Sequence, residues 1–214
     1  MTNESITLDQ LTGWLTRFRD LVTEQVAYLT ELDSAIGDAD HGSNMTRGMD
    51  AVVEKIQAAP ASTVDALFKG VGMTLVTTVG GASGPLYGTF FLRLGATAGP
   101  VETLDAPGLA AALRAGMGGV VTRGKAEAGD KTMVDVLGPA LDAFDAAVIV
   151  SPDIAAAAHA AYAAAQEGRD LTEALLARKG RASYLGERSI GHIDPGAAST
   201  SLLFQALFET LTKE

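Results

Sequence analysis

Apolar residues recur at intervals of three and four positions along most of this chain, and this period constrains the fold more than any other feature. The first run places apolar side chains at Leu8, Leu11, Leu15, Phe18, Val22, Leu29 and Leu32. Residues at this spacing share one face of a helix, so the run predicts an amphipathic helix from 8 to 32. No stretch alternates apolar and polar residues convincingly, and "AAVIVSP" (146–152) is too short and isolated to predict a strand. The pattern therefore predicts an all-α protein of about eight helices.

The remaining helical pattern falls in seven further segments: 43–58, 62–79, 86–99, 105–124, 133–148, 152–179 and 201–211. Ser43 or Asn44 is expected to cap the first of these, and Gly168 to break the alanine-rich one. Residues 180–199 are expected to form a long loop. Abundant alanine favours closely packed helices. No repeat or linker divides the sequence, so we expect a single domain over 1–214, built from long antiparallel helices with functional loops between them.

Acidic residues outnumber basic ones by 26 to 16, which gives a net charge of −10. No cluster of Lys and Arg is visible, so we expect no binding to nucleic acid. A nucleotide ligand stays open, because a bound divalent cation can reverse the local charge. The lack of cysteine excludes disulfides, thiolate catalysis and cysteine-ligated zinc. The N-terminus does not resemble a signal peptide and no apolar run could span a membrane, so we expect a soluble, cytoplasmic protein.

The segment "LDSAIGDADHGSN" (32–44) places Asp33, Asp38 and Asp40 in a polar break between two helices. At this spacing the carboxylates can converge only if the chain turns, which Gly37 permits. Three converging carboxylates repel one another unless a cation lies between them, and an all-oxygen set suits Mg²⁺, Mn²⁺ or Ca²⁺. The following "HGSN" opens a helix, where free N–H groups favour an anion. The alternative is an Asx-rich turn that only links two helices.

Three later loops carry further candidate groups. "GGASG" (80–84) is a small-residue loop at a helix start, or simply a tight turn. "GDKTMVD" (129–135) offers Lys131 as a charge near phosphates and Met133 as an adaptable contact for a flat ring, or else a helix cap. "RASYLGERSIGHIDPG" (181–196) supplies arginines and an Asp-Pro-Gly turn, or only solvated charge and an ordinary turn.

Four segments resemble the nucleotide-binding subunit of bacterial dihydroxyacetone kinases, and they occur in that family's order. They are "LDSAIGDADHGSNMTRG", "GGASGPLYGTFF", "RGKAEAGDKTMVDVLGPA" and "RASYLGERSIGHIDPGAAS". The resemblance runs from about Leu32 to Ser199, and the flanking helices are compatible with it. It implies an eight-helix antiparallel barrel or bundle with nucleotide-binding loops at one end. One departure is Ala39, where the family often has glycine; this should affect only the turn geometry.

The resemblance also implies a ligand set: ADP or ATP, held with two Mg²⁺ ions that are bound by Asp33, Asp38 and Asp40. The residues implied to contact the nucleotide are His41, Gly42, Ser43, Asn44, Ala82, Ser83, Gly124, Met133, Arg181, Asp194, Pro195 and Gly196. Residues 41–44 and 82–83 would line the phosphates, while Gly124 and Met133 would border the adenine. Arg181 and the Asp-Pro-Gly turn would close the site. The catalytic assignment is the three aspartates together with Arg181, which would neutralise charge that develops during transfer.

Two partners follow from the resemblance. A separate substrate-binding subunit would hold dihydroxyacetone covalently, and a phosphohistidine donor protein of the phosphotransferase system would rephosphorylate the bound ADP. The alternatives are an ATP-using kinase subunit for another short ketose, such as erythrulose, and a nucleotide-loaded regulatory module without catalysis. The sequence leaves open which ketose is used, whether ADP is retained, the oligomeric state (a homodimer is one option) and the role of His192.

Overall fold

The computed structural model describes residues 4–212, and these fold into nine α-helices, two 3-10 helices and two short strands. The helices are α1 (Leu8–Glu24), α2 (Val26–Ile36), α3 (His41–Ala58), α4 (Val64–Thr78), α5 (Ser83–Ala98), α6 (Ala106–Gly124), α7 (Val134–Val150), α8 (Ile154–Leu171) and α9 (Pro195–Thr212). The 3-10 helices are η1 (Thr172–Ala174) and η2 (Arg181–Ser189), and the strands are β1 (Ser5–Thr7) and β2 (Thr103–Asp105). The all-α prediction is confirmed.

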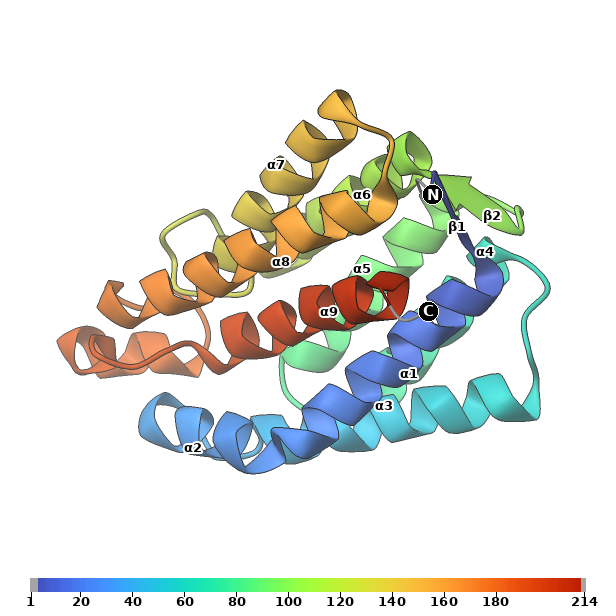
Figure 1. The fold of residues 1–214 in the computed structure, drawn as a ribbon. Helices are drawn as coiled ribbons and strands as arrows, with labels where there is room; N and C mark the ends of the chain where they lie inside the picture. Colours follow the sequence, from blue (N-terminus) through green and yellow to red (C-terminus); the bar gives the residue numbers. More distant parts are fainter. Residues whose placement is uncertain (1–3, 213–214) are drawn as a thin grey trace.

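Eight of the helices form a closed ring. Going round it, α1 packs on α3, then α4, α5, α6, α7, α8 and α9 follow in order, and α9 packs back on α1. The chain reverses between consecutive helices of the ring, through α2 between α1 and α3 and through residues 172–194 between α8 and α9, so adjacent helices run antiparallel (Figure 1). The ninth helix, α2, lies against α3 and α9 at one end of this ring. The predicted eight-helix antiparallel barrel is therefore confirmed, with α2 as an addition.

Helix α2 is additional because the single helix predicted from 8 to 32 is in fact two helices, α1 and α2. The chain leaves helical geometry at Gln25, which ends α1 and precedes α2. The apolar period continues across this break, since Leu29 is buried on α2 just as Val22 is on α1. A period in sequence therefore does not reveal a change in helix direction.

The strands were also not expected. β1 and β2 pair antiparallel in a register that joins Ser5 to Asp105 and Thr7 to Thr103. Each strand has only three residues, which is too short to display an alternating pattern. The pair joins the start of α1 to the start of α6 (Figure 1).

Two helix boundaries near the C-terminus also differ from the prediction. Helix α8 does not break at Gly168; a β-carbon there would lie 2.5 Å from the Asp135 carbonyl oxygen, so this glycine allows α8 and α7 to approach closely. Helix α9 begins at Pro195, six residues before the predicted start at 201, because Pro195 suits a first helical position. The predicted loop at 180–199 is thus partly 3-10 helix and partly the first turns of α9.

The core of the barrel is aromatic where α1, α4 and α5 meet. Phe68 and Phe91 stack with ring centroids 5.7 Å apart, and Trp14 meets both rings edge-on. Helices α4 and α5 also approach closely at Gly72 and Gly88, since a β-carbon on Gly88 would lie 2.4 Å from Val76 Cγ2. Small residues on the helix surfaces thus allow the close packing that the alanine-rich composition predicts.

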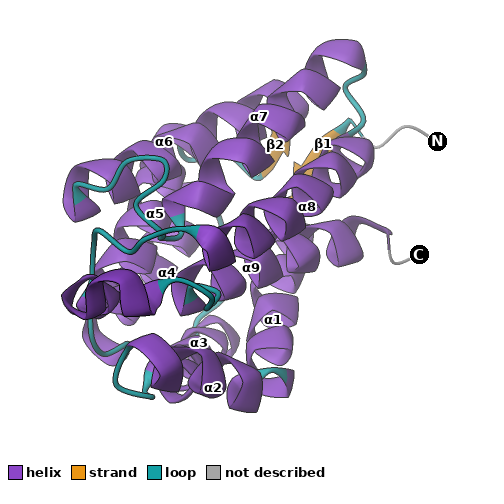
Figure 2. Ribbon diagram, turned by 90° about the vertical axis from the view of Figure 1, so that its left-hand side faces the viewer, coloured by secondary structure: helices purple, strands orange, loops and turns teal. Residues whose placement is uncertain are grey.

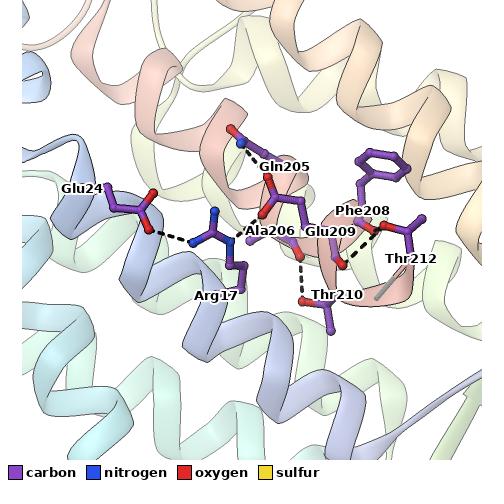
Figure 3. A network of polar contacts seen from close by, with 8 residues as sticks. All are labelled: Arg17, Glu24, Gln205, Ala206, Phe208, Glu209, Thr210 and Thr212. Atoms are coloured by element: carbon purple, nitrogen blue, oxygen red, sulfur yellow. Dashed lines mark hydrogen bonds and ion pairs between the residues drawn. The ribbon is translucent and has the colours of Figure 1, made fainter. Parts of the chain in front are cut away.

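On the outside, a polar network joins the first and last helices. Arg17 on α1 forms ion pairs with Glu24 and with Glu209 of α9, and Gln205 donates to the same Glu209 carboxylate at 2.7 Å (Figure 3). The Arg17–Glu24 pair is exposed, and such pairs contribute little individually, on the order of 0–1 kcal/mol, whereas the Arg17–Glu209 pair is partly buried. Within residues 4–212, no helix is both long enough and apolar enough to cross a membrane.

Candidate functional site

A cavity of about 440 Å³ opens at the end of the barrel where α2 lies. Figure 2 looks onto this end, and the loops that connect the helices there face the viewer. The wall of the cavity is built by the α2–α3, α4–α5 and α6–α7 connections and by the chain around η2 and the start of α9. The four sequence segments singled out above therefore meet at one cavity, although they are far apart in the chain.

The acidic loop brings its three carboxylates together. Oxygen atoms of Asp33, Asp38 and Asp40 lie within 4.8 Å of one another, close enough to share a cation. Asp33 is buried and its Oδ2 accepts the backbone N–H groups of Asp40 (2.8 Å) and His41 (3.1 Å), so it also caps α3. The helix therefore begins at His41 with Asp40 as N-cap, and the predicted caps, Ser43 and Asn44, lie inside it.

The backbone of this loop depends on two residues. At Gly37 a β-carbon would lie only 2.0 Å from Asp33 Oδ1, so glycine is required for this carboxylate to turn toward the loop. Ala39 has a φ of 60°, in the left-handed region that favours glycine. The departure at position 39 thus falls on the turn residue, as the sequence predicted.

Arg181 lies beside the acidic cluster. Its Nη2 is 2.9 Å from Asp38 Oδ2, and its side chain is about two-thirds exposed at the cavity mouth. The guanidinium therefore partly neutralises the three carboxylates from the solvent side.

His41 is buried between two hydroxyl groups. Its Nε2 lies 2.9 Å from Ser199 Oγ on α9, and its Nδ1 lies 3.2 Å from Ser83 Oγ at the start of α5. Burial lowers the pKa of His41, and the nearby Asp33 and Asp40 only partly oppose this effect. The ring is therefore neutral near pH 7 and carries one proton.

The position of that proton follows from the hydroxyl network behind the ring. Tyr87 OH contacts Ser199 Oγ (2.7 Å) and Thr200 Oγ1 (3.0 Å), and both of those oxygens contact the Gly196 carbonyl. Together with the contact between His41 Nε2 and Ser199 Oγ, the network contains five hydrogen-bond contacts. The hydroxyl groups of Tyr87, Ser199 and Thr200 have three protons and can donate only three of these bonds. A proton on Nε2 adds a fourth, so the network favours this tautomer and leaves Nδ1 to accept from Ser83. Burial raises the pKa of Tyr87 to about 12, which keeps its hydroxyl protonated.

The other residues of the first phosphate segment do not line the cavity. Gly42 packs on α2, since a β-carbon there would lie 2.4 Å from the Val26 carbonyl oxygen. Ser43 is exposed and donates to the Asp40 carbonyl, and Asn44 is buried and accepts from Arg47. The Asn44 N–H is bonded to the Asp40 carbonyl oxygen at 2.9 Å, so the backbone N–H groups of Gly42 and Ser43, in the first turn of α3, are the ones directed toward the end that holds the cavity.

The remaining predicted nucleotide contacts are on the cavity wall: Ala82, Ser83, Gly124, Met133, Arg181, Asp194, Pro195 and Gly196. Met133 is buried at the start of α7, and Leu86 and Val120 add apolar surface beside it. One side of the cavity is thus apolar and suits a flat ring, while the acidic cluster lies on another part of its wall.

Asp194 combines two roles at the start of α9. Its Oδ2 accepts the Ala197 N–H at 2.8 Å, and its own N–H donates to Thr172 Oγ1 at 3.0 Å. Burial raises the pKa of Asp194 to about 7, although the Ala197 N–H and Lys131 oppose this shift. A carboxyl group that changes charge near neutral pH therefore lies on the cavity wall.

Lys131 does not have the contacts that its sequence context predicted. Although the residue borders the cavity, its ammonium is bonded to backbone carbonyl oxygens, including those of Thr172 (2.6 Å) and Leu175 (3.2 Å). His192 contributes another of these carbonyl oxygens while its imidazole is exposed. The side chains of Tyr87, Ser199 and Thr200, like this use of Lys131, were not found from the sequence, because no local motif marks them.

Helices α3, α5, α7 and α9 all begin at the cavity end, and the residues at their starts line it. Helix N-termini carry partial positive charge and favour anions. An acidic cluster suited to a divalent cation, a rim that favours anions and an apolar slot together define a class: helical barrels equipped for a metal-bound phosphate ligand with a flat ring.

Comparisons with known proteins give the family. The model of the DAK2 domain matches residues 35–209. The chain is 46% identical over 203 residues to the ADP-binding subunit of the PEP-dependent dihydroxyacetone kinase of Escherichia coli, covering 95% of this chain and 97% of that one. It is 43% identical over 206 residues to the ADP-binding subunit of the PTS-dependent enzyme of Lactococcus lactis, covering 96% and 99%.

A solved structure agrees with these relatives. The dihydroxyacetone kinase of C. freundii in complex with AMP-PNP and Mg²⁺ superposes with a TM-score of 0.72 at 26% identity. The match covers 98% of this chain and 35% of that one, so this chain spans about a third of that kinase. The chain belongs to the DAK2-domain family, among the ADP-binding subunits of dihydroxyacetone kinases.

Proposed function

We propose that this chain is the nucleotide-carrying subunit of a dihydroxyacetone kinase, which holds ADP with Mg²⁺ and passes a phosphoryl group to dihydroxyacetone on a separate substrate subunit. The convergence of three aspartate carboxylates beside a cavity lined by helix starts is the observation that carries this proposal. The near full-length similarity to the ADP-binding subunits supports it.

The donor set fits magnesium, because three carboxylates supply only oxygen atoms and leave coordination sites for phosphate and water. We assign Asp33, Asp38 and Asp40 to two Mg²⁺ ions. When bound, these ions neutralise phosphate charge and stabilise the phosphoryl group in transfer. Asp33 ties this cluster to α3 through its two N–H contacts, so the carboxylates are held before any ion binds.

The chain's own groups position the nucleotide. The neutral His41 ring holds the Ser83 hydroxyl, and the first turns of α3 and α5 direct the N–H groups of residues 42, 43 and 83 toward the phosphates. Met133 and Gly124 border the adenine on the apolar side. Residues 194–196 close the site, and Arg181 leaves Asp38 to meet the phosphoryl group as charge develops.

Phosphoryl transfer passes through a loose transition state and depends on positioning and charge neutralisation more than on a general base. We therefore assign no base on this chain. The phosphoryl source would be a phosphohistidine protein, because the relatives covered almost in full are named as dependent on PEP or on the PTS. The L-erythrulose 1-kinase of Mycolicibacterium smegmatis is 34% identical to this chain, against 46% for the ADP-binding subunit of Escherichia coli, which favours the dihydroxyacetone assignment. Because PEP is a cytoplasmic metabolite, we place the assembly in the cytoplasm.

Reconstitution tests this function. The purified chain, loaded with ADP and Mg²⁺, is mixed with a substrate subunit carrying dihydroxyacetone and with a phosphorylated phosphohistidine donor. We expect dihydroxyacetone phosphate to form, and none to form when this chain is omitted. Product formation from ATP in the absence of the donor would favour the ATP-using alternative. No product from either phosphoryl source would favour a nucleotide-loaded regulatory module without catalysis.

A further inference from the structure

The ammonium group of Lys131 is the buried charge that the proposed mechanism does not use. The residue is only 1% exposed, and within residues 4–212 its ammonium has no carboxylate within ion-pair distance. Its donors meet the carbonyl oxygens of Thr172 (2.6 Å), Leu175 (3.2 Å) and His192, with that of Glu173 at 3.5 Å. Burial lowers the pKa of Lys131, while Asp194 and Glu173 oppose this effect.

These carbonyls belong to the two ends of one segment. Thr172, Glu173 and Leu175 lie where α8 passes into η1, and His192 lies just before α9. The same ends are joined by the Gly191 N–H, which donates to the Glu173 carbonyl at 2.8 Å. We call residues 172–192 the clasped segment, because Lys131 binds its start and its finish together.

The clasped segment forms one side of the cavity. It carries Arg181, which pairs with Asp38, and residues 179–182 line the cavity. Other contacts also hold it: the Arg178 N–H donates to the Asp130 carbonyl at 3.1 Å, Lys179 lies 4.0 Å from the Asp130 carboxylate, Thr172 Oγ1 accepts the Asp194 N–H at 3.0 Å, and Ala177 and Ala182 pack on Ile36 of α2. Through its carbonyl contacts, Lys131 is a major attachment between this wall and the α6–α7 connection.

We propose that Lys131 is a positioning residue that holds the clasped segment against the nucleotide cavity and thereby slows release of the bound nucleotide. The ammonium does not bind phosphate in this role, because its donors are already taken by carbonyl oxygens. The inference concerns the nucleotide and so rests on the function proposed above. Its structural part, the fastening of residues 172–192, is independent of that function.

The first test measures the segment without any nucleotide. Hydrogen exchange of the wild-type chain is compared with that of Lys131→Gln, which keeps two N–H donors, and Lys131→Ala, which keeps none. We expect amide exchange within 172–192 to rise at least tenfold in Lys131→Ala and by less in Lys131→Gln, with the barrel helices unchanged. Unchanged exchange in this segment would overturn the proposal. If Lys131→Ala fails to fold, Lys131→Gln alone carries the comparison.

The second test measures release of a fluorescent ADP derivative in the presence of Mg²⁺ by stopped flow. We expect release at least tenfold faster from Lys131→Ala, and recovery to within threefold of wild type when propylammonium is added to refill the carbonyl cage. Tetramethylammonium, which lacks N–H donors, should not restore it. Lys69→Ala is the control, since Lys69 is an exposed lysine on α4 that is not among the residues lining the cavity, and release from this variant should stay within twofold of wild type.

The outcomes separate this inference from the proposed function. If the wild-type chain binds no ADP but Lys131→Ala shows the expected faster exchange in residues 172–192, the proposed function is contradicted. The role of Lys131 in holding the clasped segment would still be supported. ADP binding with release that Lys131→Ala does not accelerate would overturn the inference and leave the function standing. Faster release without a change in exchange of residues 172–192 would mean that Lys131 contacts the phosphates directly, and would also overturn the inference.

Discussion

The two ends of the barrel begin their helices differently. At the end away from the cavity, α1 starts with a capping box from Thr7 and Gln10, α6 starts at Asp105, which accepts the Gly108 N–H, and α8 starts at Asp153, which accepts the Ala155 N–H. The strands β1 and β2 join two of these starts. These three helix starts are capped by the side chains of their own N-cap residues. Helix α4 also begins at this end, and its first N–H groups, those of Val64 and Asp65, donate to the carbonyl oxygens of Val101 and Gly99.

At the cavity end, α3, α5 and α7 begin after Asp40, Ala82 and Met133, and none of these residues caps its helix with its side chain. Helix α3 receives a cap from Asp33 of α2, α7 receives one from Thr132, whose Oγ1 accepts the Val134 N–H, and α9 is capped by Asp194. The starts of α3 and α5 still present N–H groups at the cavity that also holds the acidic cluster, where a ligand can satisfy both. The comparison teaches that the end away from the cavity satisfies its helix starts within the protein, whereas part of the cavity end keeps these groups for binding.

The largest effect is expected from Asp38→Asn, which removes one negative charge from the cluster at nearly constant shape. ADP affinity in the presence of Mg²⁺ should fall at least about 100-fold, equivalent to about 2.7 kcal/mol, because the cation loses a carboxylate ligand. Isothermal calorimetry measures this directly. Without ligand, stability should change by less than about 1 kcal/mol, since Asp38 is paired with Arg181, whose side chain is exposed.

The matched control for that substitution is Asp142→Asn. Asp142 is also an exposed aspartate paired with an arginine, Arg114, but it lies on α7 away from the cavity wall. The ADP affinity of Asp142→Asn should match that of the wild type. Equal losses in Asp38→Asn and Asp142→Asn would show that net charge, and not the cluster, governs binding.

An intermediate effect is expected from Asp194→Asn, at the start of α9, where the Asp194 carboxyl group accepts the Ala197 N–H. The pKa of Asp194 is raised to about 7, so its stabilising contribution is fully present below the unfolded pKa near 3.8 and is lost as the pH rises through about 7. The ligand-free wild type should therefore lose about 1–2 kcal/mol relative to Asp194→Asn between pH 5 and pH 8. Urea unfolding of both proteins across this range measures the difference, and parallel pH profiles would contradict it.

The smallest effect is expected at the opposite end. Asp153→Ala removes the side chain that accepts the Ala155 N–H at the start of α8. Unfolding should become easier by about 1 kcal/mol, while ADP affinity should stay within twofold. Thermal unfolding and calorimetry on the same sample check both halves. A loss of affinity here would show that the two ends are not independent.

Much of this organisation could be predicted from the sequence, because helical period and turn chemistry are local properties. The apolar period predicted an all-α chain of about eight helices, and the family resemblance implied the barrel. Gly37 permitted the turn that brings Asp33, Asp38 and Asp40 together. What could not be predicted depends on partners distant in the chain. His41 and Ser199 are separated by 158 positions, and Lys131 reaches carbonyls more than 40 positions away. Every residue has a backbone carbonyl group, so the sequence does not distinguish a lysine that binds such groups from a lysine that binds phosphate.

The central claim, that the cavity end binds a nucleotide through a cation, is tested most directly by titrating ADP into the metal-free chain with Mg²⁺ and again with a chelator. We expect affinity to be at least about 100-fold greater with Mg²⁺, because the three carboxylates repel the phosphates until a cation lies between them. Equal affinity in the two titrations would contradict the claim.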